Sequence, residues 1–227
     1  MKKKRVDYSG FSLRRLREPR FSHMLLLLGW VGYFALYFIT ENLIPVERCH
    51  EIHCVLDDMI PFREGFVIIY VAWYAVCFGS LAYTLFFDVP NFRRLQIYIM
   101  ITQALAMLCY IVYPSIQLLR PAEFPRQNFF TWVLGLIYAF DTPMGVCPSL
   151  HVAYSCGFLS VAWKDERLSK YTKIAALLFT LAVSVAVCAV KQHSAVDVLA
   201  ALPVCLIAEF IVFWKDYWKP KLQKLAK

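Results

Sequence analysis

Two histidines and an aspartate form the set of side chains in this sequence that is best suited to chemistry. His193 and Asp197 are four residues apart, so on a helix they would share one face and hydrogen-bond. A carboxylate behind an imidazole fixes its tautomer and supports its cationic form, as a nucleophile or base requires. His193 and His151 both stand at the ends of membrane-length apolar runs, where polar groups are costly unless they have partners or a task. The pattern indicates a functional site.

His151 closes a polar stretch rich in turn residues, 141–151, in a chain that is otherwise mostly apolar. Pro148 fits the first position of a helix over the apolar run that follows. Ser149 and His151 would then lie on the first turn, where free N–H groups and the helix dipole favour an anion. The stretch alone leaves open an ordinary capped helix with an incidental histidine.

Phosphoryl transfer is the chemistry that this set favours. His193 would attack phosphorus, and Asp197 would stabilise the imidazolium that develops. His151 would protonate the leaving oxygen and later deprotonate the incoming water or alcohol. Cationic and hydroxyl side chains and helix-start amides would hold the phosphoryl oxygens. The candidates for that role are Arg120, Lys191 and Ser149. We expect no metal and no cofactor, because no cluster of carboxylates indicates one.

The composition predicts a membrane protein. Apolar residues make up 60% of the 227 residues and the mean hydropathy is +0.54, which points to a chain that crosses a membrane several times. The net charge of +8 invites a nucleic-acid interpretation, but the positive residues lie in short segments between apolar runs. We therefore expect membrane lipids and a lipid phosphate or diphosphate substrate as partners, and no nucleic acid. The oligomeric state is left open.

The apolar pattern predicts an all-α fold: a six-transmembrane-helix bundle with a short interfacial helix before the fourth span. The expected spans are 22–44, 66–87, 95–112, 148–163, 174–190 and 194–214. Residues 128–140 are apolar but short, as in an interfacial helix or a re-entrant loop. Basic residues in 90–94 and 164–173 read as a turn and a loop. Residues 1–21 and 215–227 read as basic cytoplasmic tails around a membrane domain, 22–214.

The distribution of charge predicts the orientation of these spans. With the N-terminus in the cytoplasm, 19 of the 24 Lys and Arg residues fall on the inner side, as the positive-inside rule requires. The five outer ones are Arg48, Arg63, Arg120, Arg126 and Lys191. The same orientation brings residues 141–151 and 191–197 together on the extracytoplasmic side of the cell membrane. The charge count did not require this agreement, so it supports a single composite site.

The first outer loop, 45–64, contains two cysteines and two histidines. Cys49 and Cys54 could form a disulfide if the loop faces an oxidising space. With His50 and His53 they could also suggest zinc, but the spacing matches no common structural zinc site.

The motifs around these residues resemble the type 2 phosphatidic acid phosphatase superfamily of membrane lipid phosphatases and phosphotransferases. That family has three outer motifs: Lys-x6-Arg-Pro, Pro-Ser-Gly-His and Ser-Arg-x5-His-x3-Asp. Arg120-Pro121 fits the end of the first, residues 148–151 fit the second with Leu150 in place of glycine, and His193-x3-Asp197 fits the third. The Pro-Ser-Leu-His variant resembles the branch that includes inositol phosphorylceramide synthases and bacterial relatives. Two further features look like the same branch, namely Leu56-Asp57-Asp58 and Ile60-Pro61-Phe62.

The resemblance covers about residues 45–205 and implies a six-helix bundle with His193 as nucleophile, His151 as general acid and base, and Asp197 as orienting acid. It also implies that Ser149 and Leu150 contact the substrate. The chain departs from the family in its cations. Tyr113 stands where the first motif has lysine, and Val187 where the third has arginine. Lys191 and Arg126 are the candidates to replace these charges.

Three functions are compatible with this pattern. The leading hypothesis is a metal-independent lipid phosphatase that acts through a phosphohistidine intermediate. The second is a phosphotransferase that moves a phospho-headgroup to a lipid or glycan hydroxyl, and it differs only in whether water reaches the intermediate. The third is a non-catalytic transporter or interaction protein built on the same bundle. The complete set of two histidines and one aspartate argues against the third.

Overall fold

The computed structural model describes residues 5–225, and 72% of it is helical. Lys2, Lys3, Lys4 and Lys227 of the basic tails lie outside the described residues. The α-helices are α1 (Leu28–Leu43), α2 (Val55–Met59), α3 (Val67–Phe87), α4 (Val89–Val112), α5 (Phe129–Phe140), α6 (Leu150–Lys164), α7 (Lys170–Ala189), α8 (Ala195–Phe213) and α9 (Lys219–Leu225). Short 3-10 segments lie at Leu13–Arg15, Ser22–Leu27, Val46–Arg48 and Glu64–Phe66, and a π-helical turn at Trp214–Trp218. The strands β1 (His50–Glu51) and β2 (Ser115–Ile116) form one short parallel pair.

Five helical segments between residues 5 and 225 are long and apolar enough to cross a membrane, in agreement with a multi-pass protein. They are Ser22–Leu43, Glu64–Phe87, Val89–Val112, Lys170–Ala189 and Ala195–Lys224. The expected fourth span, 148–163, is α6, which has only 15 residues. At 1.5 Å per residue it is about 22 Å long, short of a hydrocarbon layer of about 30 Å. Of the six membrane-length helices that the sequence predicts, five are therefore present among the described residues, and α6 is too short to be the sixth.

The short helix α6 lies at the centre of the bundle. It packs against α4, α7 and α8, and nine of its residues are buried. A side chain on Gly157 would place a Cβ 2.8 Å from the Tyr98 ring on α4, so glycine allows these two helices to approach closely. Because its neighbours surround it, α6 contacts helices rather than solvent or lipid along most of its length. Its position brings its N-terminal turn, with His151, into the interior of one end of the bundle.

Two helix boundaries and one tail differ from the sequence prediction. α4 begins at Val89, because Asp88 caps it by accepting the Asn91 N–H (3.4 Å) and Pro90 fits the first turn. Residues 90–94 are thus helical, not a turn. α7 begins at Lys170, where the Ser169 hydroxyl accepts from the Thr172 N–H (3.2 Å). Residues 214–225 continue α8 through the π-helical turn into α9.

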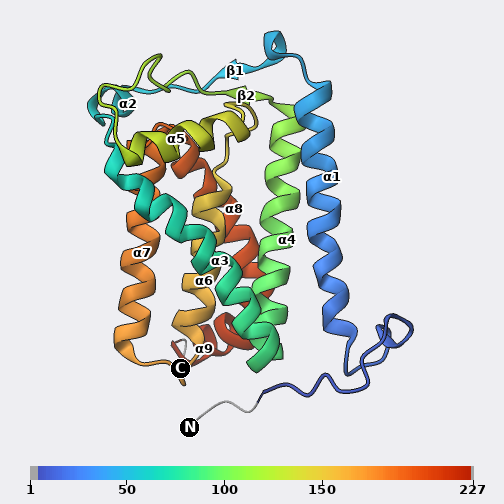
Figure 1. Ribbon diagram of the computed structural model, residues 1–227. Coiled ribbons are helices and arrows are strands. Elements are labelled where there is room, and N and C mark those ends of the chain that lie inside the picture. The colour runs from blue at the N-terminus through green and yellow to red at the C-terminus, as the bar shows by residue number, and fades with distance from the viewer. Residues whose placement is uncertain (1–4, 226–227) are drawn as a thin grey trace.

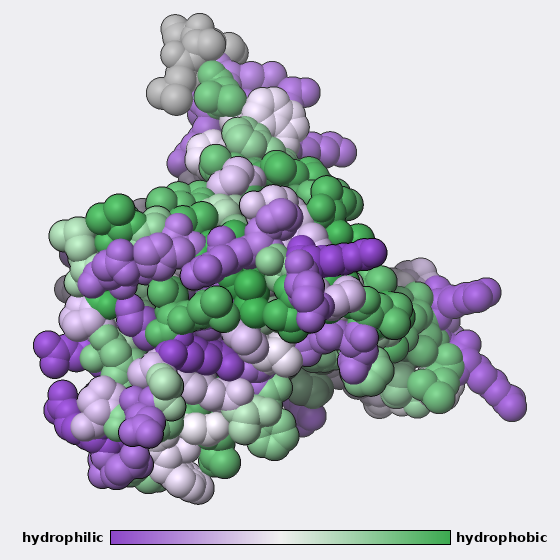
Figure 2. Space-filling view, turned by 90° about the horizontal axis from the view of Figure 1, so that it is seen from above, coloured by the Kyte–Doolittle hydropathy of each residue, from purple (hydrophilic) through white to green (hydrophobic). Residues whose placement is uncertain are grey.

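The ends of the bundle differ in structure (Figure 1). The N-terminal segment of the described chain and α9 lie at one end, and α2, α5 and the β1–β2 pair cover the other. α5 is the short apolar helix expected at 128–140, and Asn128 caps it by accepting from the Phe130 and Thr131 N–H groups. Seen from above, hydrophilic residues are spread among hydrophobic ones across the end with α2 and α5 (Figure 2). The turn that holds His193 is joined to α2 in this cover by the hydrogen bond from the Ser194 hydroxyl to Asp57 (2.6 Å).

Candidate active site

His193 lies in the tight turn that joins α7 to α8. Lys191 has a left-handed backbone conformation (φ 54°), and the N–H groups of Gln192 and His193 both donate to the Val187 carbonyl (2.9 and 3.1 Å). The next residue, Ser194, is the N-cap of α8, and its hydroxyl accepts from the Val196 N–H (3.1 Å). The imidazole is therefore fixed by a turn on one side and a helix cap on the other.

Asp197 lies in the first turn of α8 and is completely buried. One of its oxygens, Oδ2, accepts from His193 Nδ1 (3.1 Å) and from the Ser194 N–H (2.9 Å). The four-residue spacing thus correctly predicts the contact between His193 and Asp197, but the structural cause of the contact differs from the one expected. His193 is not on the same helix face as Asp197; it precedes the N-cap, and the capping box turns the carboxylate back toward it. The positive end of the helix dipole favours the ionised carboxylate at this position.

His151 lies in the first turn of α6 and faces His193. Its Nδ1 is 3.3 Å from Nε2 of His193, and its ring packs against Trp73 and Tyr70, with centroid distances of 4.3 and 4.7 Å. Because Nδ1–H of His193 donates to Asp197, Nε2 of His193 carries the lone pair. The hydrogen-bond network thus assigns the proton of the inter-histidine contact to Nδ1 of His151. Nε2 of His151 is buried without a protein partner.

The start of α6 differs from the cradle that the sequence predicts. The helix begins at Leu150, and Pro148 lies outside it, with its carbonyl accepting from the Tyr110 hydroxyl (2.7 Å). Ser149 is the N-cap and is fully buried, and its N–H already donates to the Asp197 carbonyl (3.0 Å). The Ser149 hydroxyl has no protein partner. Leu150 and His151 line the cavity described below, but Ser149 does not.

Neither of the two expected phosphate-binding cations lines that cavity. The Lys191 ammonium donates to the carbonyls of Asp57 (2.8 Å) and Ile60 (2.6 Å), beneath α2. The Arg120 guanidinium donates to Gln192 Oε1 (2.5 Å) and stacks on Tyr138, 4.6 Å from the ring centroid. Arg120 is therefore separated from the cavity by the side chain of Gln192, whereas Lys191 points to another part of the molecule.

A cavity of about 230 Å³ adjoins the two histidines. Its walls come from α1, α3, α4, α6 and the loop before α6. Nine of the 19 residues that line it are aromatic, namely Trp30, Tyr33, Phe34, Tyr37, Trp73, Tyr74, Phe78, Tyr110 and Tyr154. The rings of Phe34 and Phe78 are each about half exposed at the outside of the bundle. The cavity thus extends from the histidines toward the surface between α1 and α3.

Asp141 is a site residue whose role the sequence did not assign. It lines the cavity together with His193, accepts from the Tyr37 hydroxyl and from Gln192 Nε2 (both 3.4 Å), and is the C-cap of α5. Burial raises the pKa of its carboxyl above the ordinary value, although the charges of His193 and Arg120 oppose this shift. Its position at the start of the turn-rich stretch 141–151 was a signal in the sequence, but it indicated no role for this carboxyl group.

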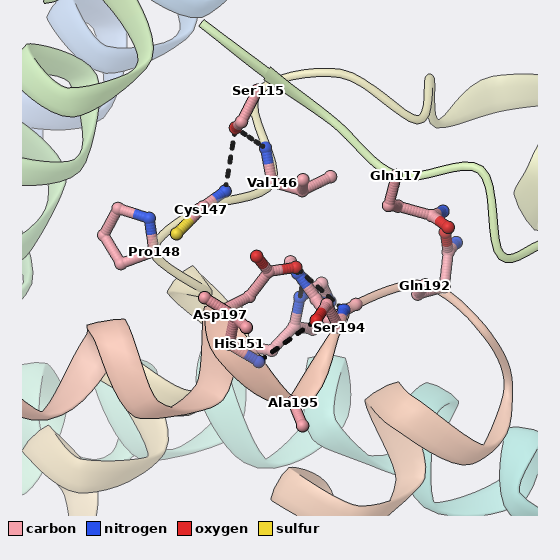
Figure 3. A network of polar contacts seen from close by, with 12 residues as sticks. Ser115, Gln117, Val146, Cys147, Pro148, His151, Gln192, Ser194, Ala195 and Asp197 are labelled. Carbon is pink, nitrogen blue, oxygen red and sulfur yellow. Dashed lines mark hydrogen bonds and ion pairs between the residues drawn. The ribbon is translucent and has the colours of Figure 1, made fainter. Parts of the chain in front are cut away.

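The loop before α6 is held by β2. The hydroxyl of Ser115 accepts from the N–H groups of Val146 (3.2 Å) and Cys147 (3.1 Å), as Figure 3 shows, and its carbonyl accepts from Gly145 (2.8 Å). Gly145 has a positive φ of 57°, which glycine adopts without strain. In the same view Asp197, Ser194 and His151 lie together. Through these bonds, Ser115 of β2 fixes the position of residues 145–147 and hence of the N-terminus of α6.

The two thiols of the loop 45–64 are free. The Cys49 thiol donates to the Pro45 carbonyl (3.7 Å), and Cys54 is the N-cap of α2. Among residues 5–225, no three His, Cys, Asp or Glu side chains gather in a group that could hold a metal ion.

Comparisons with known proteins give no assignment: no family model, no curated protein and no solved structure matches this chain.

Proposed function

We propose that this protein is a membrane enzyme that removes a phosphoryl group from a lipid phosphate or diphosphate ester through a phosphohistidine intermediate. One observation carries the proposal: Asp197, His193 and His151 form a continuous hydrogen-bonded row that ends at an aromatic cavity. The carboxylate lies behind the first imidazole, and the second imidazole lies at the nitrogen that would attack. The resemblance to the type 2 phosphatidic acid phosphatases points to the same chemistry.

The proposed reaction starts with the exchange of one hydrogen bond. The phosphate ester binds as its monoanion, gives its proton to His151 and then accepts a hydrogen bond from His151 Nδ1–H, which frees the lone pair on Nε2 of His193. His193 attacks phosphorus and the bond to the leaving oxygen breaks, while Asp197 stabilises the imidazolium. A protonated His151 gives its proton to the leaving oxygen, then takes one from the water that attacks the phosphohistidine. Inorganic phosphate leaves and His193 returns to its neutral form.

The lipid part of the substrate fits the aromatic cavity. Its opening between α1 and α3, beside Phe34 and Phe78, faces the direction from which a lipid would arrive if these helices cross a membrane. Apolar walls exclude water and strengthen electrostatic interactions at the phosphate. Displacement of Gln192 would bring Arg120 to the phosphoryl oxygens, the role expected for this cation.

A phosphotransferase is the second candidate, and Asp141 favours it. Its carboxyl group lines the cavity beside His193 and could accept a hydrogen bond from an alcohol, and the aromatic walls leave little room for bulk water. In this version a lipid or glycan hydroxyl replaces water in the second step.

The proposed location is the cell membrane, with both termini in the cytoplasm and the active site on the extracytoplasmic side. The distribution of Lys and Arg supports it, as only five of the 24 lie in the outer segments. The arrangement of the bundle is compatible with it, because the N-terminal segment and α9 share one end, whereas α2, which hydrogen-bonds to the His193 turn, lies at the other (Figure 1).

The direct experiment is to incubate purified protein with labelled lipid phosphates and to measure inorganic phosphate and new phospholipid separately. Phosphatidic acid, phosphatidylglycerol phosphate and a polyprenyl diphosphate cover the main headgroup classes. A phosphatase releases phosphate with water alone, whereas a transferase needs an alcohol. Absence of both products for every lipid and acceptor would contradict the proposal.

A further inference from the structure

Asp57 is a buried acid that hydrogen-bonds to the residues following the nucleophile. It belongs to α2, far from His193 in the sequence, and only 2% of it is exposed. Its Oδ1 accepts from the Ala195 N–H (2.7 Å), and its Oδ2 accepts from the Ser194 hydroxyl (2.6 Å). Oδ2 also accepts from the Cys54 N–H, which closes the cap of α2 (2.9 Å). Asp57 thus joins the first outer loop to the first turn of α8.

The same loop also holds the other side of His193. The Lys191 ammonium, only 9% exposed, donates to the main-chain carbonyls of Asp57 and Ile60. The side chain can reach them because the left-handed conformation of Lys191 turns it away from the cavity. His193 is therefore flanked by two attachments to one short segment, at residue 191 and at residues 194–195.

The attachment matters because two carboxylates share the start of α8. Asp197 Oδ2 accepts hydrogen bonds from His193 and from the Ser194 N–H, while Asp57 accepts from the Ser194 hydroxyl and from the Ala195 N–H. Without Asp57, those two donors would be left buried and unpaired, which is costly. Asp197 lies in the same helix turn, and its Oδ1, which has no protein partner, could accept from them. Asp197 would then be drawn away from His193.

The charge state of Asp57 agrees with this arrangement. Burial raises the pKa of its carboxyl, but the hydrogen bonds from Ser194, Ala195 and Cys54 outweigh it, so the pKa lies below the ordinary value. The group is therefore ionised at neutral pH, and both of its oxygens are free to accept these bonds.

We propose that Asp57 and Lys191 are positioning residues: they hold the 191–195 turn so that Asp197 keeps its hydrogen bond to His193 and Nε2 of His193 faces the cavity. The proposal rests on the proposed function for its kinetic consequences. It also gives Lys191 a role other than contact with the phosphate, and it gives a role to the Leu56-Asp57-Asp58 sequence.

The test uses Asp57→Asn and Lys191→Met in the full-length purified protein, with the neighbouring exposed acid changed in Asp58→Asn as the matched control. In both test variants kcat should fall about tenfold to a hundredfold, the usual scale for a displaced catalytic group. Binding of inorganic phosphate should change less than about threefold, because neither group touches it. Asp58→Asn should behave like the wild type. Weaker phosphate binding in Lys191→Met would instead make Lys191 a phosphate ligand and overturn its part of the proposal.

Two further measurements separate positioning from a merely structural role. The acid limb of kcat/KM should move to lower pH in Asp57→Asn, because a loosened Asp197 supports the His193 cation less. On an Asp197→Asn background the same change should cost less than about twofold, since it acts through Asp197. If Asp57→Asn lowered kcat by the same factor in the Asp197→Asn protein as in the wild type, the proposal would be contradicted.

A measurement without turnover keeps the proposal testable if the proposed function fails. Nitrogen NMR of labelled histidine should show His193 protonated on Nδ1 in the wild type and a mixture of tautomers in Asp57→Asn. An unchanged tautomer in Asp57→Asn would overturn the positioning role, whatever the protein catalyses. Wild-type protein that releases no phosphate and transfers none, but shows the tautomer change, would refute only the proposed function.

Discussion

Replacement of Asp197 by asparagine should remove most of the activity while the fold remains. The carboxylate oxygen is 3.1 Å from Nδ1 of His193, and the aspartate is fully buried. In an effective dielectric of about 20, unit charges at that distance attract by about 5 kcal/mol. The attraction is complete only when His193 becomes cationic, so its loss falls on the transition state. At about 1.4 kcal/mol per factor of ten, the rate should fall between 10³-fold and 10⁴-fold.

The assay is rapid-quench measurement of phosphoenzyme formation with p-nitrophenyl phosphate, together with thermal unfolding of each variant. The chain provides a matched control, because His53 and Asp58 form the same type of pair on the surface (2.9 Å), with the Asp58 side chain 66% exposed. Asp58→Asn should leave the rate unchanged, since exposed ion pairs contribute little. An Asp197→Asn protein that is folded and keeps more than about a tenth of the rate would refute the proposed role of this carboxylate.

Three other predictions follow from the site and its orientation. His151→Ala should still form the phosphoenzyme from p-nitrophenyl phosphate, whose leaving group needs little acid, but should hydrolyse it slowly because water lacks its base; equal losses in both steps would contradict this. Asp141→Asn should raise the unfolding temperature more at pH 8 than at pH 4. The folded protein binds the Asp141 proton more tightly than the unfolded chain does, so stability falls as pH rises from about 3.8 through the raised pKa. The opposite pH dependence would show that the ionised form is favoured. In intact cells, Cys49 should react with an impermeant thiol reagent, and cysteines introduced by Arg93→Cys and Lys170→Cys should not; labelling at position 170 would reverse the orientation.

The sequence predicts the helices well where a long apolar run determines them. The helical segment Ser22–Leu43, α3 and α5 begin and end within a few residues of the expected limits, because apolar composition and caps act locally. The prediction is weaker for α6. Its short apolar run was counted as a span, but burial among three other helices, which only the assembled bundle provides, allows a helix of 15 residues.

The candidate site was predictable in its histidines and not in its cations. Four-residue spacing indicates the contact between His193 and Asp197, although a helix cap produces it. A lysine two residues before a nucleophile suggests a phosphate ligand by charge alone. The direction of the Lys191 side chain depends on the backbone conformation of that residue and on main-chain carbonyls of a distant loop. Neither can be inferred from the sequence separation between Lys191 and His193. The same holds for Gln192 and Asp141, since loops far apart in the sequence place them beside Arg120 and the cavity.

The central claim is that a phosphoryl group is transferred to His193. The most direct test is to quench the enzyme during turnover at alkaline pH, where phosphohistidine survives, and to locate the phosphate by mass spectrometry. We expect one phosphorylated peptide, carrying the phosphate on His193, and none in His193→Ala, with unchanged labelling when EDTA is present. A phosphate found on another residue, or full turnover by His193→Ala, would contradict it.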